Sequence, residues 1–117
     1  DVVFVITPLT PDTEHLIGAS ELAAMPQDAL LVNVARGRVV DTEVLVAATA
    51  TGRIRAALDV TDPEPLPPDH PLWRTPGVLI SPHVGGQSTA FQPRMLRLVR
   101  EQLARFAAGE PLANIVA

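Results

Sequence analysis

The sequence contains no cysteine, no tyrosine and no lysine, and each absence removes a class of chemistry. Without cysteine the chain has neither disulfide bonds nor thiolate metal ligands. The lack of lysine excludes a Schiff-base nucleophile and a P-loop lysine. Since tyrosine is also missing, proton transfer near neutral pH is left to three histidines, or to carboxylates whose pKa is shifted.

Strong charge and long apolar runs are also missing. The 117 residues carry a formal net charge of −4, which gives no electrostatic footprint for nucleic acid or an anionic membrane surface. No apolar run approaches the roughly 20 residues that a membrane helix needs. The chain starts at Asp1, with no initiator methionine and no basic leader. We therefore expect a cytoplasmic protein without nucleic-acid or membrane partners, and a start that lies inside a longer chain.

Short β-branched apolar runs alternate with helical patterns along the first 60 residues. Strands are predicted over residues 2–7, 29–34, 56–60 and 78–81, the first of them buried on both faces. Helices are predicted from a Ser20 cap to about residue 25, from an Asp41 cap to about residue 50, and over residues 89–108. Gly52 and Gly109 are the expected stops. Seven prolines between residues 63 and 82 exclude a helix there.

This alternation predicts an α/β fold with a parallel sheet. Ligands of such sheets bind beyond the carboxyl ends of the strands. The residues that follow the predicted strands therefore nominate Arg36, Asp59 and His83 as a candidate site. No combination of residues indicates a metal site.

Each candidate has a plausible chemical role. Arg36 offers a planar fork that matches a carboxylate, and Gly37 permits a tight turn behind it. His83 follows Pro82 and precedes two glycines, and it can exchange a proton near neutral pH. A carboxylate beside an imidazole favours the protonated ring. Spacing alone does not choose between Glu64 and Asp62 for that partner.

Seven stretches, taken in order, resemble the D-isomer-specific 2-hydroxyacid dehydrogenase family. They are Thr-Pro-Leu-Thr-Pro at 7–11, Leu-Val-Asn-Val-Ala-Arg-Gly at 31–37, Val-Asp at 40–41, Ala-Ala-Leu-Asp-Val at 56–60, Glu-Pro-Leu at 64–66, His-Pro-Leu-Trp at 70–73 and Ser-Pro-His-Val-Gly-Gly at 81–86. The resemblance covers nearly the whole chain, and the ordered series is far more specific than any one stretch.

The resemblance implies roles for individual residues. Arg36 is similar to the arginine that binds the substrate carboxylate and carbonyl, and His83 to the general acid–base at the C2 oxygen. Glu64 is similar to the glutamate that hydrogen-bonds this histidine, which favours it over Asp62. Asp59 resembles the aspartate that holds the nicotinamide carboxamide. The implied cofactor contacts are Thr7, Val34, Ala35, Arg36, Asp59, His83, Val84, Gly85 and Gly86.

The family also implies a reaction and an architecture. Residues 1–117 would form the second half of a doubly wound, Rossmann-like nicotinamide-binding domain, closed by a long C-terminal helix and tail at 89–117. The implied reaction interconverts a 2-oxoacid and a D-2-hydroxyacid with NAD or NADP, and the implied full-length protein is a homodimer. Glyoxylate, hydroxypyruvate, phosphohydroxypyruvate and pyruvate all fit as substrates, and the same scaffold also serves formate and phosphite dehydrogenases, so the substrate stays open.

The sequence departs from the family pattern in one major respect. It contains neither the glycine-rich phosphate loop, with its following acidic residue, nor a substrate domain. We therefore expect the chain alone to be inactive. A second hypothesis remains open, because relatives of this fold act as corepressors that bind a dinucleotide and partner peptides. Turnover of 2-oxoacids would separate the two.

Overall fold

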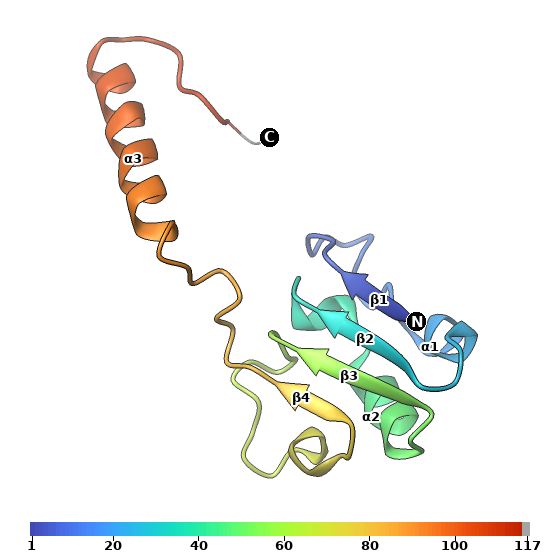
Figure 1. The fold of residues 1–117 in the computed structure, drawn as a ribbon. Helices are drawn as coiled ribbons and strands as arrows, with labels where there is room; N and C mark the ends of the chain where they lie inside the picture. The colour runs from blue at the N-terminus through green and yellow to red at the C-terminus, as the bar shows by residue number, and fades with distance from the viewer. Residues whose placement is uncertain (116–117) are drawn as a thin grey trace. The chain divides into compact units, whose positions relative to one another are not determined.

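The structure is a computed structural model that describes residues 1–115 in two units, Asp1–Gly85 and the residues from Gly86 onward. The first unit holds a four-stranded sheet in the order β1-β2-β3-β4, with every neighbouring pair parallel (Figure 1). The strands are β1 (Val2–Val5), β2 (Ala29–Asn33), β3 (Ile54–Leu58) and β4 (Val78–Ile80). The predicted parallel α/β sheet is confirmed.

All four predicted strands exist, but their ends were placed wrongly. β1, β2 and β4 stop one or two residues earlier than predicted, and β3 starts and ends two residues earlier. The apolar runs continue past the last ladder position, because apolar residues such as Ile6 and Val34 already belong to the loops beyond the sheet. Hydrophobic pattern therefore located the strands but overestimated their length.

The two short helices differ in how they begin. α1 (Ala19–Ala24) is capped by Gly18 and not by Ser20 as predicted, because Glu21 Oε2 accepts from the Gly18 N–H at 3.0 Å. The Ser20 hydroxyl donates instead to Glu21 Oε1 at 2.7 Å. α2 (Thr42–Ala50) starts as predicted, with Asp41 Oδ1 accepting from Val44 N at 3.1 Å. Its C-terminal stop is also confirmed, since Gly52 has a φ of 70°.

The core lies on one face of the sheet. Helices α1 and α2 sit on the same side of it (Figure 1), and Leu22 and Leu45 pack with Leu31 and Ile54. Side chains on the other face stay open within this unit, and Phe4 is 63% exposed. The prediction that the first strand is buried on both faces is therefore wrong for the described part of this unit, because its helices cover a single face.

The proline-rich segment joins β3 to β4 without an α-helix. The sequence predicts no helix anywhere in this segment. In the structure, however, Pro71–Arg74 form a short 3₁₀ turn. Proline is tolerated at its first position because the N–H it lacks would have had no partner there. Buried Leu66 and Leu72 anchor the segment to the core. A second 3₁₀ turn, Gly37–Val39, follows β2.

The second unit contains the long helix α3 (Phe91–Ala107), which starts two residues later than predicted. Gly109 ends it as expected, with a φ of 67° and its N–H donating to Phe106 O at 3.2 Å. Residues 116–117 of the predicted tail lie outside the described residues. Within the described residues, no helix has both the length and the apolar character needed to cross a membrane.

Candidate active site

The nominated polar residues all follow the carboxyl ends of neighbouring strands. Arg36 lies after β2, Asp59 and then Glu64 after β3, and His83 after β4. Because the strands are parallel and adjacent, their carboxyl ends share one edge of the sheet. The loops that carry these residues are therefore neighbours, although they lie far apart in sequence.

A buried amide holds the Arg36 loop in shape. Asn33, at the last position of β2, is 1% exposed. Its Oδ1 accepts from Ala35 N, and its Nδ2 donates to Arg36 O, both at 3.0 Å. The amide thus satisfies two backbone groups of the turn. Sequence reasoning gave Asn33 no role; the available signal was a polar residue ending an otherwise apolar strand.

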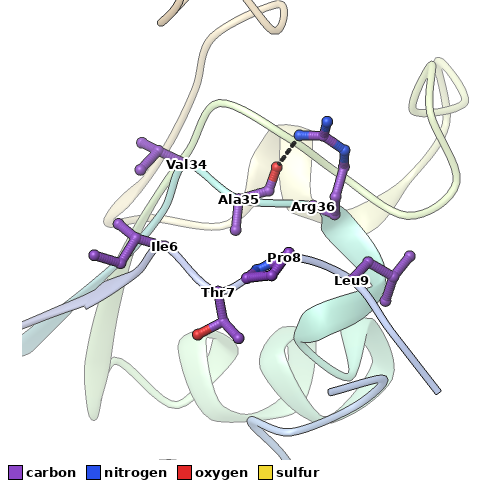
Figure 2. Close-up of a pocket in the computed structure, with 7 residues that line it drawn as sticks. All are labelled: Ile6, Thr7, Pro8, Leu9, Val34, Ala35 and Arg36. Atoms are coloured by element: carbon purple, nitrogen blue, oxygen red, sulfur yellow. Dashed lines mark hydrogen bonds between the residues drawn. The ribbon is translucent and has the colours of Figure 1, made fainter. Parts of the chain in front are cut away.

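The Arg36 side chain is exposed and turns back on its own loop. Its Nη1 donates to the Ala35 carbonyl at 2.7 Å, and in Figure 2 the guanidinium points away from Thr7. Among residues 1–115, no carboxylate lies within 4.0 Å of it. A guanidinium has five N–H donors, so most of them remain available to an anionic ligand.

The Arg36 loop packs directly on the loop after β3. A Cβ atom built at Gly37 would overlap the carbonyl group of Thr61 and lie 2.7 Å from Asp62 N. Glycine is therefore required by this close approach of two backbones, and not only by the tightness of the turn. The contact couples the loop of Arg36 to the loop that carries Glu64.

His83 and Glu64 meet as predicted. His83 Nδ1 and Glu64 Oε1 lie 2.6 Å apart, and the side chains are 46% and 39% exposed. The structure thus selects Glu64 over Asp62 as the carboxylate that contacts the imidazole. The contact with Glu64 occupies Nδ1 and orients the imidazole ring. Nε2 is therefore the ring nitrogen left to exchange a proton with a ligand.

Asp59 has partners within the chain. Its Oδ1 accepts from Ser81 Oγ at 2.5 Å and from Val84 N at 2.9 Å, and its Oδ2 accepts from Gly85 N at 2.8 Å. The Ser81 hydroxyl, followed by the Gly85 and Val84 N–H groups, holds the pKa of Asp59 below its usual value. Asp59 is therefore a carboxylate at neutral pH. Sequence reasoning also missed Ser81, whose place beside the histidine motif was the only hint.

Two hollows lie at this edge of the sheet. The first measures about 530 Å³ and is lined by Ile6, Thr7, Pro8, Leu9, Val34, Ala35 and Arg36 (Figure 2). It gathers four predicted cofactor contacts, Thr7, Val34, Ala35 and Arg36. The second, about 180 Å³, is lined by Glu64, His83 and the indole of Trp73, among others.

Val84 and Gly85, also predicted to contact the cofactor, lie on the His83 loop, and their N–H groups donate to the Asp59 carboxylate. Gly86 belongs to the second unit, and its contact with a cofactor stays a prediction. Within the part of the chain that the structure describes, no group of three or more histidine, aspartate or glutamate side chains is placed so that it could bind a metal ion.

The chain is similar to known proteins in sequence and in fold. Residues 1–85 match the family model described as D-isomer specific 2-hydroxyacid dehydrogenase, NAD binding domain. The chain is 44% identical over 117 residues to a glyoxylate reductase of Aeropyrum pernix, covering 99% of this chain and 35% of that protein. It is 48% identical to glyoxylate/hydroxypyruvate reductase B of Escherichia fergusonii, covering 99% and 36% of the two chains.

The chain is also similar to a solved structure of a named member of this family. The D-isomer specific 2-hydroxyacid dehydrogenase of Xanthobacter autotrophicus Py2, in complex with NADPH and MES, matches with a TM-score of 0.86 and 43% identity. That match covers 99% of this chain and 48% of the solved one. The chain spans 22% to 38% of the length of the curated relatives compared with it.

Proposed function

The chain belongs to the D-isomer-specific 2-hydroxyacid dehydrogenase family, and from this premise we propose that its strand-end loops carry the catalytic residues of such an enzyme. The proposed reaction interconverts a 2-oxoacid and a D-2-hydroxyacid. Residues 1–117 would supply the C-terminal half of the nicotinamide-binding domain. Because the chain spans little more than a third of its relatives' length, the substrate domain and the phosphate-binding half would come from the rest of the protein.

The observation that carries the proposal is the exposed Glu64–His83 pair at the sheet edge that also presents the exposed Arg36 guanidinium, whose Nη1 donates to the Ala35 carbonyl. Arg36 would bind the substrate carboxylate through a bidentate fork. His83 would donate a proton from Nε2 to the C2 oxygen during reduction and accept it back during oxidation. Glu64 would hold the ring in place through its contact with Nδ1.

The first hollow accommodates one end of a dinucleotide. Its volume of about 530 Å³ lies within the range of roughly 300–1,000 Å³ that is usual for small-molecule sites. Thr7, Val34 and Ala35 would line the cofactor there, and the acceptor capacity left on Asp59 would receive its carboxamide. When bound, NAD or NADP would supply the hydride. The chain's own residues would orient the substrate and transfer the proton.

The relatives suggest a substrate class. Two of them are a glyoxylate reductase and a glyoxylate/hydroxypyruvate reductase, so we propose a small 2-oxoacid of this kind. Phosphohydroxypyruvate stays within the proposed range because a D-3-phosphoglycerate dehydrogenase is also a relative. We propose that the whole protein works in the cytoplasm as a homodimer, with no nucleic-acid or membrane partner.

The test uses the intact protein that contains this chain. We expect it to oxidise NADH or NADPH in the presence of glyoxylate or hydroxypyruvate. His83→Gln should lower kcat by about 10² to 10⁴, the usual contribution of a general acid, and still bind the cofactor. Arg36→Lys keeps the charge but loses the fork, so it should raise KM for the oxoacid more than KM for the cofactor.

Two outcomes would contradict the proposal. One is a wild-type protein that binds the dinucleotide but reduces no 2-oxoacid, which would favour the corepressor hypothesis. The other is an unchanged kcat in His83→Gln.

A further inference from the structure

The loop that presents His83 has an unfavourable backbone conformation. His83 has a φ of 55°, in the left-handed region, which costs a residue with a side chain about 1–2 kcal/mol. The one backbone hydrogen bond at its own N–H is to Ser81 O, at 3.0 Å. Such a conformation persists only where surrounding contacts enforce it. Something outside residue 83 must therefore hold the loop.

The Asp59 carboxylate makes those contacts on both sides of His83. Ser81 Oγ donates to it from two residues before the histidine, and the N–H groups of Val84 and Gly85 donate to it from directly after. Three donors from one loop converge on one charged group, and hydrogen bonds to a charged acceptor are stronger than neutral ones. The Asp59 carboxylate thus holds the backbone on both sides of His83, the residue with the strained φ.

Asp59 is itself fixed by the sheet. Its N–H donates to Asn33 O at 3.0 Å, extending the ladder between β3 and β2. On the other side, Ser81 N donates to Leu58 O at 2.8 Å and continues the pairing of β4 with β3. Because the Asp59 backbone is part of the sheet, its carboxylate fixes the Ser81–Gly85 loop relative to the sheet.

The contact leaves no spare room at Gly85. A Cβ atom there would lie 2.8 Å from Asp59 Oδ2 and 3.4 Å from its Cγ. Any side chain at residue 85 would push the carboxylate away from the two N–H groups. The absence of a side chain is thus part of the fit, and it provides a way to disturb the contact without altering charge.

We infer that Asp59 and Ser81 are positioning residues, which fasten the Ser81–Gly85 loop and so set the contact between His83 and Glu64. The two carboxylates divide the work. Glu64 contacts the imidazole directly, whereas Asp59 fixes the backbone that aims it. The consequence for catalysis rests on the proposed function, but the consequence for the Glu64–His83 contact does not.

Ser81→Ala is the principal test in the intact protein, since Ser81 has no proposed contact with substrate or cofactor. It removes one of three donors and keeps both carboxylates. We expect kcat for 2-oxoacid reduction to fall about tenfold, the equivalent of one lost charge-assisted hydrogen bond, with KM for the oxoacid unchanged. Ser81→Thr retains the hydroxyl and should restore most of the rate.

A second measurement needs no substrate. The proton shared by His83 Nδ1 and Glu64 at 2.6 Å should give a downfield proton resonance in NMR spectra. Ser81→Ala should weaken or shift this resonance, and Gly85→Ala should do the same without removing a donor. Asp69→Asn is the control for charge, because Asp69 is exposed in the proline-rich segment, and it should change nothing.

The results separate the inference from the proposed function. If the resonance changes in Ser81→Ala while the wild-type protein reduces no 2-oxoacid, the positioning role stands and the proposed function falls. If the wild-type protein is active and Ser81→Ala alters neither kcat nor the resonance, the positioning role is overturned. Should Ser81→Ala fail to fold, Gly85→Ala with an unchanged resonance and kcat would overturn it equally.

Discussion

Replacing Gly37 with alanine tests the contact between the two loops that carry Arg36 and Glu64. The added Cβ would overlap the Thr61 carbonyl group and lie 2.7 Å from Asp62 N, well inside the ~3.5 Å at which non-bonded atoms pack. Both neighbours are backbone, so no rotamer change relieves the overlap. The two loops must move apart by more than about 1 Å, because the added Cβ would overlap the Thr61 oxygen itself.

Overpacking of this kind costs typically ~1–3 kcal/mol. We place Gly37→Ala at the upper end, about 3 kcal/mol in the free energy of unfolding, because Gly37 is buried and its neighbours are main-chain atoms. With a urea m-value of roughly 1–3 kcal/mol/M, the unfolding midpoint should fall by about 1 M or more. A misplacement of ~1 Å at the site also predicts a loss of activity of about 10².

Urea titration followed by tryptophan fluorescence measures the effect. Trp73 is the single tryptophan of the chain, and its Nε1 donates to Pro67 O at 2.8 Å within the same unit. The control is Gly86→Ala, where a Cβ would meet nothing within 4 Å. Its midpoint should correspond to a change within about 0.5 kcal/mol. If Gly37→Ala is as stable as this control, the two loops are not packed as described.

Further predictions concern single interactions. Glu64→Gln removes the carboxylate whose Oε1 lies 2.6 Å from His83 Nδ1 and orients the imidazole, so kcat for 2-oxoacid reduction should fall while KM for the cofactor stays the same; an unchanged kcat would count against the pair. Asn33→Leu leaves the Ala35 N–H and Arg36 carbonyl unsatisfied and should lower the free energy of unfolding by about 2–4 kcal/mol, measured by urea titration; no loss would mean that water replaces the amide. The Ser81 hydroxyl and two N–H groups lower the pKa of Asp59 from 3.8, so its stabilisation is complete above that unfolded-state value and is lost as pH falls through the folded one. Acid unfolding of Asp59→Asn should therefore be less pH-dependent than that of the wild-type protein, and equal pH dependence would refute this.

Several features of the fold followed from local rules. The Asp41 cap and the Gly52 stop depend on residues close in sequence, so the sequence alone predicted α2 correctly. Ser20 was predicted by the same capping preference, but it does not cap α1. The Glu21 side chain accepts hydrogen bonds from both the Ser20 hydroxyl and the Gly18 N–H, and the helix begins after Gly18. Capping preference identifies candidates, but neighbouring side chains decide which one is used.

The site was predictable as far as topology reaches. Carboxyl ends of adjacent parallel strands must share an edge, so a carboxylate from the loop after β3 could be expected beside His83, whereas the choice of Glu64 over Asp62 came from the family resemblance. The roles of Asn33 and Asp59 in bracing loops could not, because each depends on which backbone N–H groups turn toward the side chain. The required absence of a side chain at Gly37 arises only when two loops approach in three dimensions.

The strand order β1-β2-β3-β4 bears on how the protein is built during synthesis. Among the described strands, β2, β3 and β4 each pair with the strand made just before them, so these four strands can assemble by addition at one edge. The contact between Glu64 and His83 is completed only after all four strands have been made, because His83 follows β4. On a ribosome, the nascent chain would bury the Leu31 and Ile54 core before the histidine emerges. The proposed proton-transfer pair would therefore form only after the sheet that positions it.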